Sequence, residues 1–396
     1  MAREGHGAGA LRALILVTLA YVLCFAARSL TSPLAPLLTR RFGLSPTQAG
    51  LLVAMPLFIG IIARVPTGAL ADRFGSRRVY VGLLTMLLVP VALIGTAKSY
   101  GWLMFWSFWL GIGNAAFPVG IPYLAGWFPE RKGFALGVYG LGGLGLALAD
   151  FFAPRLAESS GGNAPFLALL PLLAAAALAF WLLGADPPSS PARQSAPAKR
   201  LSDLRSEPAV WGFCFIGLVT LGDLLGFSVY VPTYLAGAYE LRLDEAAAYA
   251  AGFASVASLV RPLAGRLADR FGGFRVLDAA LAVIAVSALS MDLLPGRAVL
   301  FASLPVLALG IGVGTAALWK LVAERFPQSS GTVTGLVGAA GGLGAFLVPA
   351  LIGWLRQATG GFALGFTLLT ALALLGLGTS LLLQTRPADA GPPGQS

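Results

Sequence analysis

The feature that most constrains this chain is a series of long apolar stretches separated by short charged or Pro/Gly-rich breaks. Crossing about 30 Å of hydrocarbon takes about 20 residues of helix, and twelve stretches of about that length or longer follow one another. They cover residues 11–36, 47–71, 79–97, 102–127, 133–154, 163–184, 209–236, 246–268, 276–294, 298–322, 331–355 and 361–384. The predicted fold class is an all-α integral membrane protein with twelve transmembrane helices in two pseudo-symmetric six-helix bundles.

The composition excludes a soluble protein of this size. Of 396 residues, 57% are hydrophobic and 11% are charged, against about 25% charged in an ordinary soluble domain. The net charge of +10 comes from basic residues scattered at the ends of the apolar stretches, which does not fit a nucleic-acid-binding stripe. One histidine, two cysteines and no phosphate-binding loop predict neither an enzyme nor a metal or cofactor site.

The two halves of the chain repeat each other. Residues 64–79 align without a gap on residues 261–276, with ten identities in sixteen positions, and residues 128–143 share Phe, Pro and glycines with residues 326–341. We therefore expect an N-terminal half at 1–184, a Pro/Ser-rich cytoplasmic linker at 185–208, a C-terminal half at 209–384 and a flexible tail at 385–396. Transporters place a substrate site between such repeats, near the middle of the membrane.

The loop charges predict the orientation. With the N-terminus inside, most Lys and Arg residues fall on the cytoplasmic ends of the spans, and few fall on the outer ends. The positive-inside rule then puts both termini in the cytoplasm.

The loop after the second span carries a motif, and a weaker copy follows the eighth span. In the first, glycines allow close helix packing and Asp72 is suited to accept hydrogen bonds from the N-terminus of a neighbouring helix. The motif resembles the loop motif of the major facilitator superfamily, which implies a gating or structural role. The matching positions are Gly68, Asp72, Arg73, Gly75, Arg77 and Arg78, and Gly265, Asp269, Arg270, Gly272 and Arg275.

Two glycine-rich stretches narrow the resemblance. Residues 133–145 and 331–344 are similar to the paired signatures of the nitrate/nitrite porter family, which also carries one arginine in helix 2 and one in helix 8. Arg64 and Arg261 occupy those places here. The resemblance implies a secondary transporter, expected as a monomer in the cell inner membrane. It would move nitrate or nitrite by alternating access, with a proton or counter-anion as possible partner.

Arg64 and Arg261 are the strongest site candidates on physical grounds. Each lies eight residues before a motif aspartate, about 12 Å from the helix end at 1.5 Å per residue. A charge at that depth is costly unless it faces a cavity or a partner. A guanidinium fork fits planar oxyanions such as nitrate and nitrite. An ion pair with a carboxylate in the bundle stays open as the alternative.

Further candidates are polar, aromatic or glycine residues on the inner spans. Aromatic edges can hold a flat anion, an amide can donate to it, and glycines can wall a small pocket with backbone. For each of them, helix packing or a bond to a neighbouring helix stays open. The substrate-binding candidates are Asn114, Tyr139, Gly143, Phe227, Tyr230, Gly341 and Gly342.

The chain departs from the porter pattern at three places. The helix 5 signature lacks its usual asparagine, and Arg28 and Asp223 add charges to the first and seventh spans. We expect Arg28 and Asp223 to pair, each offsetting the desolvation of the other. A protonatable Asp223 would allow proton-coupled uptake, whereas arginines alone suit anion exchange. A carrier of another small anion, such as a short carboxylate, and a proton-coupled exporter of organic molecules remain alternatives.

Overall fold

The computed structural model describes the backbone of residues 2–187, 201–239, 243–293 and 296–385. The chain forms two compact units, and each is considered by itself. The first comprises Met1–Leu201 and Gln328–Ala339, and the second comprises Ser202–Pro327 and Ala340–Ser396. The first turns of one late helix therefore pack with the N-terminal half of the sequence.

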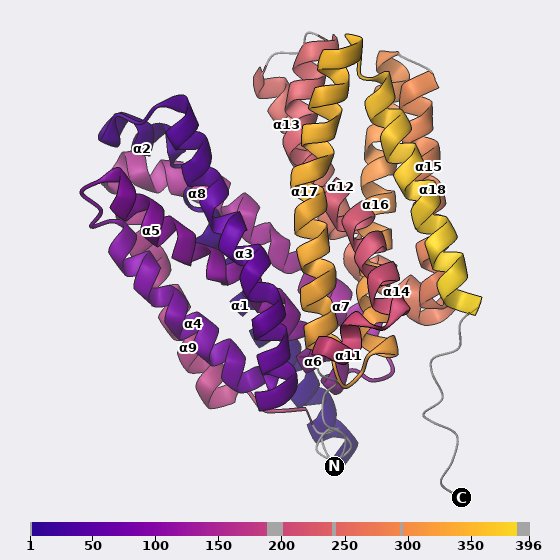
Figure 1. Ribbon diagram of the computed structural model, residues 1–396. Helices are drawn as coiled ribbons and strands as arrows, with labels where there is room; N and C mark the ends of the chain where they lie inside the picture. The colour runs from indigo at the N-terminus through magenta and orange to yellow at the C-terminus, as the bar shows by residue number, and fades with distance from the viewer. Residues whose placement is uncertain (1, 188–200, 240–242, 294–295, 386–396) are drawn as a thin grey trace, which may run out of the picture. The chain divides into compact units, whose positions relative to one another are not determined.

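The first unit is helical (Figure 1). Its described residues up to 187 form nine α-helices and two 3-10 segments, and the unit also includes the beginning of the helix Ser330–Thr359. In chain order they are α1 (Ala2–Ser29), α2 (Ala35–Phe42), α3 (Pro46–Phe74), α4 (Ser76–Ile94), α5 (Tyr100–Leu110), η1 (Gly111–Ala115), α6 (Ala116–Trp127), α7 (Lys132–Gly140), η2 (Leu141–Gly143), α8 (Leu144–Ser160) and α9 (Ala164–Leu183). The 3-10 segments η1 and η2 interrupt the fourth and fifth predicted spans without ending them.

The second unit is also helical throughout its described part. Its elements are α11 (Leu201–Arg205), α12 (Pro208–Tyr239), α13 (Leu243–Leu259), α14 (Arg261–Phe271), α15 (Gly273–Leu293), α16 (Arg297–Arg325), α17 (Ser330–Thr359) and α18 (Ala363–Thr385). Helix α17 begins in the residues that cluster with the first unit and ends in the second.

Every one of the twelve predicted stretches is helical. Ten helical stretches of the described chain are long and apolar enough to cross a membrane. Helix α12 and the pair α13 and α14 correspond to the remaining two predictions.

Several boundaries differ from the prediction, and two of the differences bear on the organisation of the chain. The first helix ends at Ser29 instead of residue 36, because Pro33 cannot donate the helical hydrogen bond of its turn. The predicted linker is partly ordered, since Leu201–Arg205 forms the short helix α11, and residues 188–200 lie outside the described chain.

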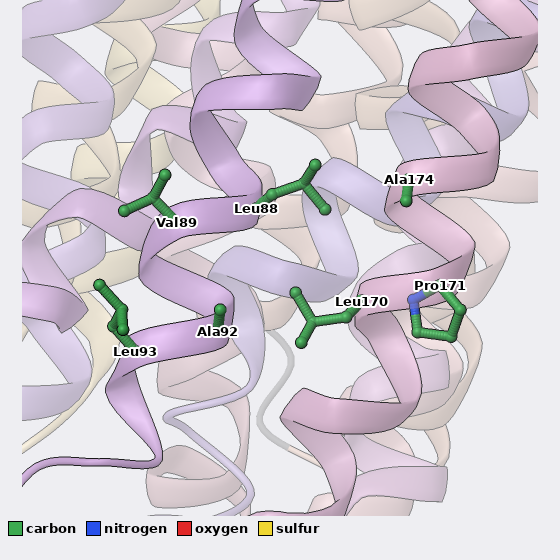
Figure 2. A pocket seen from close by; sticks show the side chains of 7 residues that line it. All are labelled: Leu88, Val89, Ala92, Leu93, Leu170, Pro171 and Ala174. Atoms are coloured by element: carbon green, nitrogen blue, oxygen red, sulfur yellow. The ribbon is translucent and has the colours of Figure 1, made fainter.

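The outer surface of both units is apolar. Large side chains such as Phe58, Trp181, Phe346 and Trp354 are each at least 60% exposed, which suits contact with lipid. Helices α4 and α9 pack side by side in the first unit, and a shallow apolar groove runs between them (Figure 2). Its lining carries no charged group and consists of Leu88, Val89, Ala92, Leu93, Leu170, Pro171 and Ala174. We assign this groove to the lipid-facing surface.

Candidate functional site

Arg64 is a buried cation in the first unit. It lies on α3, its side chain is largely shielded at 8% exposure, and its Nη1 donates a hydrogen bond to the backbone carbonyl of Gly338. No carboxylate of the described residues lies within 4.0 Å of it. Its Nε is buried and has no hydrogen-bond partner among those residues. The ion-pair alternative therefore finds no partner for Arg64 in the described part of the chain.

The carbonyl reaches Arg64 because glycines let α17 approach α3 closely. A Cβ on Gly335 would lie 2.5 Å from the backbone oxygen of Arg64, and one on Gly338 would lie 3.3 Å from its Cδ. A Cβ on Gly68 would similarly meet the carbonyl oxygen of Gly331, at 2.1 Å. Any larger residue at Gly335 or Gly68 would push the two helices apart.

Asp72 fastens the beginning of α17 to α3. Its Oδ1 accepts a hydrogen bond from the Gly331 amide at 3.0 Å. Its Oδ2 accepts from the amide and the hydroxyl of Thr332, both at 2.7 Å. The first amides of a helix have no partner within the helix, and a carboxylate also interacts favourably with the helix dipole. The sequence predicts this role for Asp72, as an acceptor of hydrogen bonds from the N-terminus of a neighbouring helix.

The two copies of the loop motif have the same local conformation. Gly75 ends α3 with φ +88° and Gly272 ends α14 with φ +92°. Residues other than glycine rarely adopt this backbone conformation. The guanidinium of Arg73 lies 5.2 Å from the ring centroid of Phe74, and in the second copy the matching distance, from Arg270, is 5.3 Å. The Nη2 of Arg77 donates to the carbonyl of Trp181 at 2.5 Å.

Arg261 occupies the matching position in the second unit. It is as buried as Arg64, at 8% exposure, and is the first residue of α14, directly after the interruption at Val260. Pro262 accounts for the interruption because it has no N–H to continue the helix. In the first repeat, Pro66 is instead accommodated inside the continuous helix α3. The repeat therefore conserves the buried arginine but not the local helix geometry.

Tyr139 and Asn114 are buried in helix contacts of the first unit. Tyr139 is fully buried, its hydroxyl donates to the carbonyl of Ala116 at 2.8 Å, and it lies 3.2 Å from the hydroxyl of Tyr80. Asn114 is 3% exposed and its Nδ2 donates to the carbonyl of Pro56 at 3.3 Å. Asn114 thus makes the bond to a neighbouring helix that the sequence left open, and Tyr139 packs in the core. Their roles in binding stay predictions.

The remaining predicted site residues are three glycines on η2 and α17 and three residues of α12 whose side chains the structure does not describe. Gly143 is half-buried in η2. Gly341 is buried in α17, where a Cβ would lie 2.5 Å from the side chain of Leu221, and Gly342 is half-buried beside it. The side chains of Asp223, Phe227 and Tyr230 lie outside the described part of α12.

Sequence reasoning did not predict the carbonyl of Gly338 as a partner, or the rings of Tyr21 and Phe117. Tyr21 lies 4.8 Å from Tyr139 and 5.4 Å from Phe117, measured between ring centroids. A backbone carbonyl leaves no mark on the sequence. The one signal in the sequence was the spacing of three and four residues between glycines of α17, which indicates that another helix approaches closely there.

Comparison with known proteins identifies the family. The profile of the Major Facilitator Superfamily matches residues 17–349 and 248–396. The chain belongs to the Major Facilitator Superfamily. It is therefore a multi-pass membrane transporter and not an enzyme.

Relatives within the Major Facilitator Superfamily include several named for nitrate or nitrite. The chain is 36% identical to the "Probable nitrate/nitrite transporter NarK2" of Mycobacterium tuberculosis, over 91% of this chain and 93% of the relative. It is 33% identical to the "Nitrite extrusion protein" of Bacillus subtilis, over 91% of each chain. It is 31% identical to the "Probable nitrate/nitrite antiporter NarK1" of Thermus thermophilus, over 92% of this chain and 89% of the relative. The predicted resemblance to nitrate/nitrite porters is confirmed.

Solved structures of superfamily members share the fold. The human organic anion transporter MFSD10 has a TM-score of 0.78 at 18% identity, covering 94% of this chain and 99% of that one. The transporter FucP, in the outward conformation, has a TM-score of 0.78 at 16% identity with the same coverage. Identities this low establish the fold, and the predicted all-α membrane fold is confirmed.

Proposed function

We propose that this transporter carries nitrate, nitrite or both across the membrane by alternating access and that Arg64 and Arg261 bind the anion. The observation that carries the proposal is the state of Arg64. Among the described residues this buried guanidinium makes one hydrogen bond, to a neutral backbone carbonyl, and no carboxylate lies within 4.0 Å of it. The names of the relatives, which refer to nitrate and nitrite, support the choice of substrate.

A charged acceptor competes well with a neutral carbonyl for the hydrogen bonds of the Arg64 guanidinium. Hydrogen bonds between ionised partners are roughly twice as strong as those between neutral groups. An oxyanion that reaches Arg64 is therefore a better acceptor than the Gly338 carbonyl, and a planar one engages two guanidinium nitrogens. Arg261, at the matching position of the second repeat and buried to the same degree, supplies the second fork in this proposal.

Anion binding then weakens one attachment of α17. The first turns of α17 are held to α3 through Asp72 and through the hydrogen bond of Arg64 to Gly338. When the anion takes over Arg64, the contact through Asp72 remains as the gate element that must open for release. Binding energy used in this way favours one conformation over another, as alternating access requires.

We further propose that both termini face the cytoplasm and that the transporter works as a monomer in the inner membrane. Whether a proton or a counter-anion accompanies transport depends on Asp223. In the proposal this residue is the protonatable group of the seventh span.

The test replaces each arginine by lysine, which keeps the charge but removes the fork. A hydrogen bond to a charged group contributes about 1.5–3 kcal/mol, so we expect Arg64→Lys and Arg261→Lys each to weaken nitrate binding roughly 10- to 100-fold. Binding of labelled nitrate to the purified protein measures the effect, with nitrite, formate and chlorate as competitors. Formate competing better than nitrite would favour the short-carboxylate alternative.

Arg40→Lys is the matched control. Arg40 is exposed on α2, and its replacement should leave binding unchanged. Undiminished binding in both Arg64→Lys and Arg261→Lys would refute bidentate recognition by these residues.

A further inference from the structure

Arg28 is a second cation in the membrane interior of the first unit, besides Arg64. It lies in the last turn of α1, where its Cβ would be 3.6 Å from a Cβ on Gly113 of η1. Gly113 is near the middle of the fourth span, Tyr100–Trp127. Arg28 therefore lies beside the middle of the fourth span, although it is near the end of its own helix, and an unneutralised charge inside the bundle is costly and marks a functional site.

The side chain of Arg28 is held by an aromatic ring. Its guanidinium carbon lies 4.1 Å from the ring centroid of Phe25, one turn earlier on α1. Helical side chains lean toward the N-terminus of their helix, so this stacking fixes the guanidinium in the direction it naturally takes. The contact is a cation–π interaction that positions the charge without neutralising it.

No carboxylate of the described residues neutralises Arg28. It makes no hydrogen bond with them and no ion pair within 4.0 Å, and its Nε is buried without a partner there. Asp150 is exposed on α8, a helix that packs against α1, and it makes no ion pair with Arg28 within 4.0 Å. Arg28 is thus a positioned guanidinium whose donors have no acceptor among the described residues.

Arg28 and Arg64 both lie near η1. Both α1 and α3 pack on η1, and Arg64 is one turn of α3, about 6 Å, beyond Gly60, which contacts Asn114. No carboxylate of the described residues is in ion-pair contact with either arginine. Two like charges near one short segment, without such a carboxylate, favour binding of an anion.

The second repeat has no equivalent of Arg28. At the offsets of 197 and 198 that relate the repeats, the matching residues are Leu225 and Gly226. The structural symmetry that explains the pair Arg64 and Arg261 therefore does not explain Arg28.

We propose that Arg28, stacked on Phe25, is an additional anion-binding residue that holds a small oxyanion together with Arg64. The inference rests on the proposed function, since it adds a third arginine to the same transport site. Two of the three proposed guanidinium ligands, Arg28 and Arg64, then belong to the N-terminal half. Removal of the Arg28 charge lowers anion affinity, and removal of the nearby Asp150 charge raises it.

Equilibrium binding of labelled nitrate to the purified full-length protein tests this. We expect Arg28→Gln to raise the Kd for nitrate at least tenfold, and Arg28→Lys to raise it by less because the charge remains. Asp150→Asn should lower the Kd two- to threefold. Arg155→Gln is the matched control, since Arg155 also stacks on an aromatic ring, with its guanidinium 3.8 Å from the centroid of Phe151, but is exposed on α8. It should leave the Kd unchanged.

Two results would overturn the proposal. One is an unchanged Kd in a folded Arg28→Gln protein. The other is a structural pair with Asp223, shown if Arg28→Gln and Asp223→Asn each lower the thermal unfolding midpoint and the double variant restores it without any change in Kd. If Arg28→Gln does not fold, Arg28→Lys and Asp150→Asn decide, and an unchanged Kd in both contradicts the inference. Arg64→Lys in the same assay separates the two proposals, because lost binding there with intact binding in Arg28→Gln overturns only the role of Arg28.

Discussion

Arg64 and Asp72 lie eight residues apart on α3, and both bind the beginning of α17. The carboxylate holds the amides of Gly331 and Thr332, and the guanidinium holds the carbonyl of Gly338. Asp72 thus accepts hydrogen bonds from donors at the start of α17, and Arg64 donates to an acceptor two turns later. At the residue scale, the fixation of α17 depends on two side chains of opposite charge, one of which is a candidate substrate ligand.

We expect Asp72→Asn to loosen the first turn of α17. Asparagine has one acceptor oxygen in place of two and no charge, so it cannot keep all three hydrogen bonds. A bond to a charged group contributes about 1.5–3 kcal/mol. Amide exchange of residues 328–339 should therefore accelerate roughly 10- to 100-fold if this segment opens locally. Hydrogen–deuterium exchange with mass spectrometry measures it.

Glu158→Gln provides the comparison for Asp72→Asn. Glu158 is an exposed acid on α8, and its replacement should not change exchange in residues 328–339. Equal exchange in Asp72→Asn and the unaltered protein would show that Asp72 does not fix α17.

At the element scale, α17 is built differently along its length. Its first part has buried glycines against α3, whereas Gly353 near its end has nothing within 4 Å of an added Cβ. Small residues allow membrane helices to approach closely. In α17 they do so where the helix meets α3 and again at Gly344, where an added Cβ would lie 2.5 Å from the backbone oxygen of Leu218 on α12. The same helix therefore offers one glycine that packing requires and one that packing does not.

We expect Gly335→Ala to destabilise the protein and Gly353→Ala not to. The new methyl group at 335 would lie 2.5 Å from the backbone oxygen of Arg64, and overpacking of this kind costs about 1–3 kcal/mol. At 353, alanine instead favours the helix by up to about 1 kcal/mol. Thermal unfolding in detergent compares the two variants. A lower midpoint in Gly353→Ala than in Gly335→Ala would contradict the assignment of close packing to Gly335.

At the scale of the whole molecule, the proposed orientation follows from loop charges and has a direct test. The two native cysteines, Cys24 and Cys214, are buried, so single introduced cysteines report accessibility. Glu130 lies exposed between α6 and α7, and Ser159 lies exposed at the end of α8. These two positions are at opposite ends of the fifth span and must face opposite sides of the membrane.

With both termini inside, Ser159→Cys should react with an impermeant maleimide in intact cells. Glu130→Cys should react only after permeabilisation, because its loop is cytoplasmic in this orientation. The unaltered protein, with its buried cysteines, sets the background. The reverse pattern would place the termini outside and overturn the orientation.

The local pattern of the sequence was sufficient for the spans and for the repeat. Hydrophobic length predicts transmembrane helices well because backbone groups in lipid must be satisfied within the segment. The ends of the elements were less predictable. Pro33 ends α1 early and Pro262 separates α13 from α14, yet Pro66 is accommodated within α3. The same residue type has different effects because packing by neighbouring helices decides whether a missing hydrogen bond is tolerated.

The sequence by itself determined three features of this protein. The membrane fold class follows from the length of the hydrophobic stretches, and the twofold repeat follows from identity at a fixed offset. The burial of Arg64 and Arg261 follows from the cost of a charge in lipid. Only the tertiary structure decided that the first turns of α17 pack with the N-terminal unit, that Asp72 caps them and that Arg64 binds the Gly338 carbonyl. It also placed the guanidinium of Arg28 on the ring of Phe25. The physical reason is that these contacts join residues far apart in the chain, and several use backbone atoms that every residue carries.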